Sequence, residues 1–232
     1  MHVSLDPSRF QAALFDVDGT LVDSLHMILQ GLADAIEHFD GFRPAEADLM
    51  KTIGTPLVMQ HPMFAQRPLA EDELRERVAY TISRYRHHVH LERWFEPAID
   101  ALRAFQRSGR PVALVTSRND EELQWFLERF PARDALAATV CASDVARPKP
   151  APDPALLACE KLGVKPEDAI FVGDSTHDAH CAHAAGCAFA AVAYGAALPL
   201  DLASAPHDAW FESPEALRDW TNGLLAERHA TI

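Results

Sequence analysis

Two aspartates, Asp16 and Asp18, stand one residue apart in the segment FDVDGT at positions 15–20. They follow the apolar run 12–15, which predicts a short buried strand, and the glycine and threonine after them favour a tight turn. Two carboxylates this close disfavour each other's ionisation unless a cation lies between them. A hard dication such as Mg2+ takes oxygen ligands and keeps water molecules that a phosphate can replace. The pair therefore predicts magnesium chemistry, whereas a bare Asp-Gly turn would have only a structural role.

Polar residues also follow three later strands that the sequence predicts. Thr116 and Ser117 come directly after the apolar run 112–115, and Lys149 lies in a proline-rich segment after the weaker run 138–141. Asp174 follows the apolar run 169–172. Ligands of open α/β sheets bind beyond the carboxyl ends of the strands, so we expect these side chains to gather at one edge of a sheet. Each signal is weak alone, but their order along the chain makes the set specific.

The elements that would position these residues alternate between strands and helices after Pro97. Helices are predicted over 98–107, about 119–130 and 154–162, and strands over 112–115, 138–141, 169–172 and 188–193. Asn119 and Glu122 predict a capping box at a helix start, and Ser213-Pro214 predicts a terminal helix. This alternation predicts an α/β fold with a doubly wound parallel sheet. The short, continuously apolar strands fit a sheet that is covered on both faces.

Residues 22–93 show a different pattern. Apolar residues recur at helical spacing over 24–39 and about 71–89, and no strong strand signal separates the two stretches. This block lies between the first and second strands of the predicted sheet. It therefore predicts an all-helical cap domain, residues 22–93, inserted into a core domain made of residues 1–21 and 94–232.

Composition narrows the classes of partner. The chain has 232 residues and a formal net charge of -13, which argues against a nucleic-acid or anionic-membrane surface. No apolar run approaches the roughly 20 residues needed to span a bilayer, and residues 1–10 lack the pattern of a secretory signal. The four cysteines have no Cys-x-x-Cys spacing and are expected to be small buried residues in a reducing compartment. We expect a cytoplasmic monomer or homodimer.

These motifs, in this order, resemble the haloacid dehalogenase-like superfamily, in its branch of phosphatases with a helical cap. The resemblance covers nearly the whole chain and includes all four motifs of the family. It implies a Rossmann-like core, a Mg2+ cofactor and a small phosphorylated metabolite as substrate. It also implies that Asp16 is the nucleophile, which forms an aspartyl-phosphate, and that Asp18 is the general acid and then the general base.

The resemblance assigns roles to the later motifs as well. Thr116 would hold phosphoryl oxygens, and Lys149 would bridge the phosphate and the nucleophile. Mg2+ would be held by Asp16, Asp174 and the main-chain carbonyl of Asp18. Asp178 would not bind the metal directly but would support the residues that do. Residues beside these motifs are expected to contact the substrate: Gly19, Thr20 and Ser117. Arg118, where the family often has lysine, is a candidate contact for an anionic substrate, with a role away from the substrate as the alternative. The charge of Mg2+ and of Lys149 would offset the repulsion between an anionic carboxylate and an anionic phosphate.

Substrate choice is expected to lie with the cap, in the loop 52–57. Its sequence Ile-Gly-Thr-Pro-Leu resembles that of phosphoglycolate phosphatases and related bacterial pyrophosphatases, and Gly54 and Thr55 are candidate contacts. Lys51 is a candidate for a substrate carboxylate or second phosphate, with a solvated surface lysine as the alternative. The leading prediction is a 2-phosphoglycolate phosphatase, and inorganic pyrophosphatase is the alternative.

The presence of Asp18 favours these two phosphatase predictions over other activities of the superfamily. Dehalogenases of this superfamily lack the second carboxylate, because their leaving halide needs no proton. Phosphonatases also replace it, and they use a cap lysine to form a Schiff base. A sugar-phosphate mutase keeps both aspartates, but its arginine-containing cap loop is not found here. A binding protein without catalysis would be favoured by the loss of Asp16, Asp18, Lys149 or Asp174, and all four are present.

Overall fold

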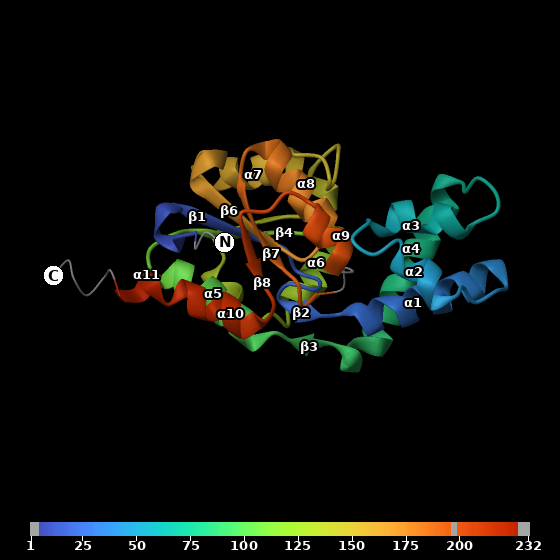
Figure 1. Cartoon of the computed structure of the whole chain (residues 1–232). Helices are drawn as coiled ribbons and strands as arrows, with labels where there is room; N and C mark the ends of the chain where they lie inside the picture. Colours follow the sequence, from blue (N-terminus) through green and yellow to red (C-terminus); the bar gives the residue numbers. More distant parts are fainter. Residues whose placement is uncertain (1–4, 196–198, 227–232) are drawn as a thin grey trace. The chain divides into compact units, whose positions relative to one another are not determined.

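The computed structural model describes residues 5–195 and 199–226, and its chain divides into two compact units (Figure 1). The core unit comprises Met1–Val22 and Trp94–Ile232, and the inserted unit comprises Asp23–Arg93. The chain passes between the units through the short strands β2 (Val22–Asp23) and β3 (Arg93–Trp94), which form a two-stranded sheet. The insertion is thus one continuous segment.

A parallel sheet forms the centre of the core unit, as predicted, and it has six strands. Its strand order is β5-β4-β1-β6-β7-β8, so the first strand lies between strands that come much later in the chain. Ala13 of β1 pairs with Val112 of β4 on one side and Ile170 of β6 on the other. The strand bounds are β1 Ala12–Phe15, β4 Val112–Val115, β5 Ala138–Val140, β6 Ala169–Gly173, β7 Ala188–Val192 and β8 Ala209–Phe211.

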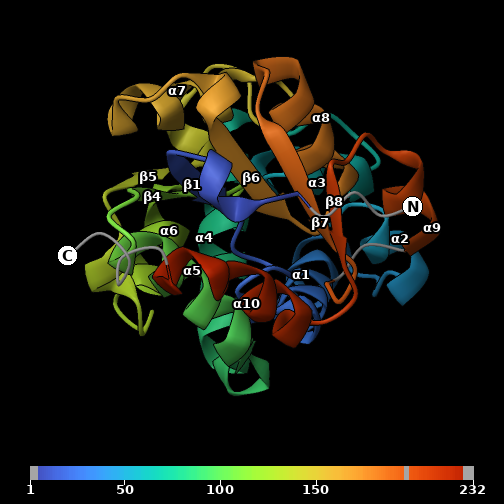
Figure 2. The same cartoon turned by 60° about the vertical axis from the view of Figure 1, so that its left-hand side comes forward.

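Helices cover both faces of this sheet (Figure 2). Successive strand residues point to opposite faces, so Phe15 joins one apolar cluster and Leu14 joins the other. On the side of Phe15 lie α5 (Glu96–Arg107) and α10 (Pro214–Thr221), which contact each other. On the side of Leu14 lie α7 (Asp153–Leu162) and α8 (Thr176–Ala185). Because both faces are buried, every residue of β1, β4 and β6 is apolar or glycine and buried.

Local capping sets the starts of three core helices. The predicted capping box is confirmed at α6 (Asp120–Leu127), where Asn119 accepts a hydrogen bond from the Glu122 amide at 2.9 Å and Glu122 accepts one from the Asn119 amide at 3.0 Å. Ser175 and Asp178 form the same motif at α8. Ser213 caps α10 through a bond from the Ala216 amide, also as predicted.

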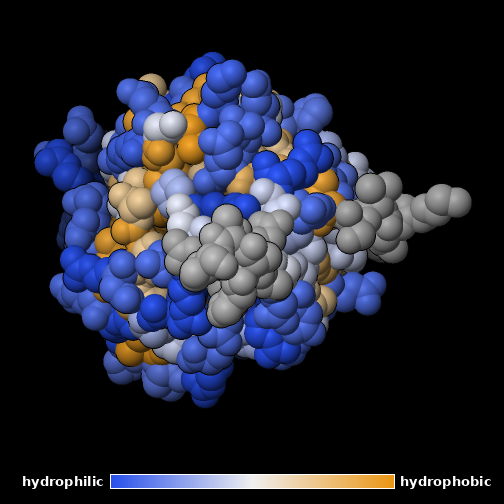
Figure 3. Space-filling model, turned by 90° about the vertical axis from the view of Figure 1, so that its left-hand side faces the viewer, coloured by the Kyte–Doolittle hydropathy of each residue, from blue (hydrophilic) through white to orange (hydrophobic). Residues whose placement is uncertain are grey.

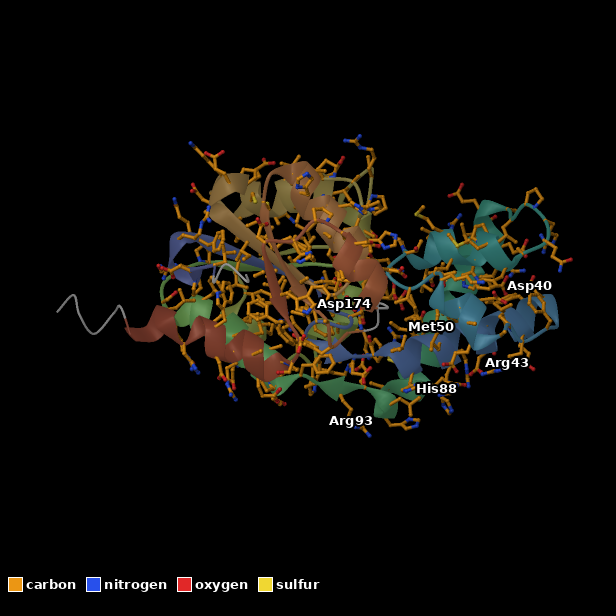
Figure 4. The ribbon with its side chains drawn as sticks, in the orientation of Figure 1. Asp40, Arg43, Met50, His88, Arg93 and Asp174 are labelled. Atoms are coloured by element: carbon orange, nitrogen blue, oxygen red, sulfur yellow. The ribbon has the colours of Figure 1, made fainter. Side chains whose placement is uncertain are left out.

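The inserted unit is built mainly from helices. Its helices are α1 (Leu25–Asp40), α2 (Glu46–Met50), α3 (Leu57–Phe64) and α4 (Glu71–His88). Helices α1 and α4 pack closely, and a Cβ atom on Gly31 of α1 would overlap the Tyr85 ring of α4. The fully buried Arg77 donates two hydrogen bonds, of 2.6 and 2.8 Å, to the carboxylate of Asp40. Asp40 lies at the end of α1 and is labelled in Figure 4.

Some elements differ from the sequence predictions. Strand β8 and helix α9 (Pro199–Ser204) were not predicted, and neither was the short α11 (Gly223–Ala226). Helix α5 begins at Glu96 rather than after Pro97, because proline is tolerated in the first turn of a helix. Helix α6 ends at Leu127, short of the predicted end near residue 130.

Two further expectations from the sequence concern membrane spans and the cysteines. The face of the molecule in Figure 3 carries mostly hydrophilic residues with small hydrophobic groups between them. No described helix combines the length and the apolar character needed to cross a bilayer. All four cysteines are buried and free of disulfides, as expected.

Candidate active site

The carboxyl ends of three neighbouring strands place the main functional candidates side by side. Asp16 follows β1, Thr116 follows β4 and Asp174 follows β6, with β1 between the other two. Main-chain bonds extend the sheet by one residue at two of these points: the Asp16 amide donates to the Val172 carbonyl and the Thr116 amide to the Val140 carbonyl, each at 2.9 Å. Asp174 is labelled at this end of the sheet in Figure 4.

Lys149 lies at the centre of the buried charges. Its Nζ donates to Asp16 Oδ1 at 2.8 Å, to Asp178 Oδ1 at 2.7 Å and to the Val115 carbonyl at 3.2 Å. The side chain is only 2 % exposed, and the carboxylates that it binds are buried as well. One ammonium thus joins the segment after β1, the end of β4 and the first turn of α8.

The charge states follow from this crowding. Burial favours the neutral amine of Lys149, but Asp16 and Asp178 outweigh that effect and raise the pKa of Lys149 above its ordinary value. Burial and then the charge of Asp178 raise the pKa of Asp16 to about 7, with Lys149 opposing both. Lys149 therefore remains a cation, and a further positive charge beside Asp16 would favour its ionised form.

A divalent cation fits among three of the carboxylates. Asp16, Asp174 and Asp178 each offer one oxygen, and these oxygens lie within 4.8 Å of one another. All three residues are buried, and a buried carboxylate is costly unless it is paired with a cation. A set of hard oxygen donors suits Mg2+. Lys149 supplies a single positive charge for this set, so the donor chemistry matches the predicted metal.

Two glycines shape the space around Asp174. A Cβ atom on Gly19 would overlap the Asp174 carboxylate, and so would one on Gly195, which follows β7. Gly19 also has a φ of +77°, a conformation that side chains other than glycine rarely adopt. Two strand-end segments therefore contact Asp174 closely and leave its carboxylate little freedom to move.

Gly19→Ala is expected to weaken Mg2+ binding by about 10–100-fold, because the new methyl group must displace the Asp174 carboxylate. Isothermal titration of the purified protein with Mg2+ measures this effect. Gly163→Ala is the matched control, since Gly163 has a φ of +70° and no atom within 4 Å of its added Cβ. It should share the backbone strain of about 1–2 kcal/mol and keep the metal affinity. Equal affinities in the two variants would contradict the role given to Gly19.

Asp18 lies beside Asp16 in sequence but has a different partner. Arg118 binds its carboxylate with two hydrogen bonds, from Nε to Oδ2 at 2.9 Å and from Nη2 to Oδ1 at 2.7 Å. The Asp18 side chain is 24 % exposed, whereas that of Asp16 is 9 % exposed. A turn in which the Gly19 amide donates to the Val22 carbonyl at 2.8 Å holds this segment. Of the two aspartates, Asp18 is the one open to solvent.

The other predicted contacts of the core unit lie in the same segments. Thr116 is buried, and its hydroxyl accepts a bond from the Arg118 amide at 3.2 Å. Ser117 is half-buried between them. Thr20 is fully buried, and its hydroxyl has no hydrogen-bond partner among the residues that the structure describes. Their contact with a substrate remains a prediction.

The three candidates of the inserted unit lie between α2 and α3. Lys51 is exposed and donates to Asp48 at 2.7 Å, as a solvated surface lysine does. Gly54 has a φ of +87°, which explains a glycine at that turn, and Thr55 is half-buried. Their role in substrate selection also remains a prediction.

Sequence reasoning missed Tyr194 and Gly195. The Tyr194 hydroxyl donates to the Thr20 carbonyl at 3.1 Å, and burial, followed by the charge of Asp174, raises the pKa of Tyr194. Both residues come just after β7, at the strand edge where ligands of such sheets bind. That position was the available signal, because β7 itself was predicted.

The comparisons with known proteins agree with this geometry. The model of the haloacid dehalogenase-like hydrolase family matches residues 13–192, which include every strand-end motif described above except Tyr194 and Gly195. The chain therefore belongs to the haloacid dehalogenase-like hydrolase family. Members of this family generally use Mg2+, which agrees with the carboxylate cluster.

Individual relatives cover most of the chain. It is 31% identical to a phosphoglycolate phosphatase of Chromobacterium violaceum over 81% of this chain and 86% of that protein. It is 28% identical to the pyrophosphatase PpaX of Bacillus cereus over 80% of this chain and 84% of that protein. A crystal structure of a predicted phosphoglycolate phosphatase from Haemophilus somnus has a TM-score of 0.77 and 26% identity, over 92% of this chain and 99% of that one. The chain is a phosphatase of this family, and its relatives differ in substrate.

Proposed function

We propose that the core unit hydrolyses a small phosphomonoester with the help of Mg2+, through an aspartyl-phosphate on Asp16. The observation that carries this proposal is the buried Asp16 carboxylate, bound by Lys149 at 2.8 Å and flanked by the Asp174 and Asp178 carboxylates. This arrangement combines a fixed nucleophile with the positive charge that an incoming phosphate requires.

In the first half of the reaction, a carboxylate oxygen of Asp16 attacks the phosphorus atom. A bond forms between that oxygen and phosphorus, and the bond from phosphorus to the substrate's alcohol oxygen breaks. Lys149 stays protonated and offsets the negative charge of the phosphoryl group that arrives at Asp16, to which it is already hydrogen-bonded. Thr116 lies at the neighbouring strand end, and this position supports the proposal that it holds a phosphoryl oxygen.

Asp18 moves the proton in both halves. It first donates a proton to the departing alcohol oxygen, which leaves as a neutral alcohol. It then takes a proton from a water molecule that attacks the phosphorus of the aspartyl-phosphate. The bond between phosphorus and the Asp16 oxygen breaks, phosphate is released and the carboxylate is restored. The greater exposure of Asp18 suits exchange with alcohol and water.

Asp16, Asp174 and the Asp18 carbonyl would hold Mg2+. When bound, the ion offsets the negative charge of the carboxylates and of the transferring phosphoryl group. Asp178 accepts bonds from Lys149 at 2.7 Å and from the Ser175 amide at 3.0 Å. It would therefore support the metal site indirectly, because it holds the Lys149 ammonium and the start of α8 in position.

The leading substrate is 2-phosphoglycolate, with Lys51, Gly54 and Thr55 as candidate selecting residues. The loop 52–57 and the similarity to a phosphoglycolate phosphatase support this choice. Pyrophosphate is the second candidate, because the chain is nearly as similar to a bacterial pyrophosphatase.

Removal of metal is expected to lower phosphate release at least about a hundredfold, since a bound metal contributes several kcal/mol of charge stabilisation. The protein is dialysed against a chelator and assayed on a panel of phosphometabolites before and after addition of Mg2+. Ranking by kcat/KM should place 2-phosphoglycolate first. A chelated protein that keeps its activity would contradict the magnesium mechanism. If pyrophosphate ranked first, the protein would be assigned as a pyrophosphatase. Activity on aromatic model phosphates alone would refute the prediction that the substrate is a small phosphorylated metabolite.

A further inference from the structure

The pair between Arg118 and Asp18 joins the proposed proton carrier to a residue one hundred positions later in the chain. Two parallel hydrogen bonds fix both the position and the plane of a carboxylate, which a single bond does not. Lysine cannot make this fork, because its charge sits on one nitrogen atom.

Arg118 is itself held on several sides. The residue is 6 % exposed, and its guanidinium carbon lies 4.9 Å from the centre of the Phe126 ring. Its amide donates to Thr116 Oγ1 at 3.2 Å, and its carbonyl accepts from the Ala142 amide at 2.9 Å. The capping box of α6 begins at the next residue, Asn119. A rigid main chain and an aromatic ring thus anchor the guanidinium.

Asp18 lies in the turn after β1 and is the more exposed of the two aspartates. The two bonds from Arg118 hold its carboxyl group in one orientation. A general acid acts only when its proton lies within hydrogen-bond reach of the leaving oxygen. Orientation of Asp18 should therefore limit the rate of proton transfer.

We infer that Arg118 is a positioning residue, which orients the Asp18 carboxyl group for its two proton transfers, first as an acid to the leaving group and then as a base from water. This inference rests on the proposed function. It differs from the sequence prediction that Arg118 contacts an anionic substrate. The guanidinium is nearly inaccessible to solvent, and two of its nitrogens already bind Asp18.

The test compares three substrates that separate positioning from substrate binding. The alkyl phosphate 2-phosphoglycolate carries a second anion, whereas glycerol phosphate is an alkyl phosphate without one. The third, p-nitrophenyl phosphate, has a leaving group stable enough to depart without a proton. The readout is kcat/KM, which reports the steps up to aspartyl-phosphate formation, where Asp18 acts as an acid. The variants are Arg118→Met, Asp18→Asn and the double variant.

Arg118→Met is expected to lower kcat/KM at least about tenfold on both alkyl phosphates and less than about threefold on p-nitrophenyl phosphate, since general acid catalysis contributes about 10²–10⁴-fold. Asp18→Asn should show the same dependence on the leaving group. Adding Arg118→Met to Asp18→Asn should change the rate little, because residues that act as one unit are not additive. Arg118→Lys should restore part of the loss.

Arg103→Met is the matched control, because Arg103 pairs with Asp134 in the core unit outside the site. It should leave all three rates unchanged, and thermal melts identify any loss of fold. A loss confined to 2-phosphoglycolate would mean that Arg118 binds the substrate and would overturn the inference. An equal loss on all three substrates, or a further loss in the Asp18→Asn background, would also overturn it. If the unaltered protein hydrolyses none of them, the proposed function itself fails.

Discussion

Asp16→Asn is expected to lower kcat at least about a thousandfold. An amide cannot serve as the attacking carboxylate, and loss of a catalytic nucleophile lowers kcat by about this factor or more. The side chain keeps its shape, and its partner Lys149 remains in place at a buried position. Phosphate release from the best substrate of the panel measures the effect. Acid-quenched protein should carry one added phosphoryl group on the peptide containing Asp16, and the variant should carry none.

Asp134→Asn is the control for this change, since Asp134 is an exposed aspartate of the same unit and lies outside the charge cluster. Its activity should equal that of the unaltered chain. If Asp16→Asn kept most of the Mg2+-dependent activity, another residue would have to be the nucleophile. A phosphoryl group found on a different peptide would identify that residue directly.

Lys149→Met is expected to lower both activity and stability. The substitution leaves Asp16 and Asp178 buried without the cation that binds them, and breaking a buried ion pair in this way costs about 3–5 kcal/mol. It also removes the charge that offsets the attack of a carboxylate on a phosphate. Urea unfolding monitored without metal gives the change in the free energy of unfolding.

Mg2+ provides a second readout for the same variant. Because the ion would supply positive charge to the same carboxylates, it should stabilise Lys149→Met more than the unaltered protein. Lys161→Met is the matched control, since Lys161 is partly exposed and its partners within the described part of the chain are the Thr139 carbonyl and, at 3.8 Å, Asp144. Equal stability losses in the two lysine variants would contradict the central role of Lys149.

The central strands of the sheet, and the polar residues that follow them, were predictable from local signals in the sequence. Continuous apolar runs identified β1, β4 and β6, and a polar residue followed each run. In a parallel sheet, these facts suffice to place Asp16, Thr116 and Asp174 at one edge. The capping box at Asn119 was also readable, because its two partners are three residues apart.

Contacts between distant segments were not predictable in this way. The pair of Asp18 with Arg118 depends on which strands become neighbours, and a single sequence does not state that. Strand β8 is three residues long and is fixed by Asp208, which exchanges hydrogen bonds with Phe189 of β7. The helix α3 contains Pro62, which removes a main-chain donor and weakens the local helical signal.

The division of the chain has a consequence for how such a protein can diverge. Every charged residue of the cluster around Lys149 belongs to the core unit, while Asp23–Arg93 enter as one continuous insertion between two short strands. Mutations, deletions or exchanges within that insertion leave the charge-bearing strand ends intact. Given the proposed role of the loop 52–57 in substrate choice, selection for new substrates can vary one part of the gene while purifying selection preserves the proposed catalytic residues encoded on either side.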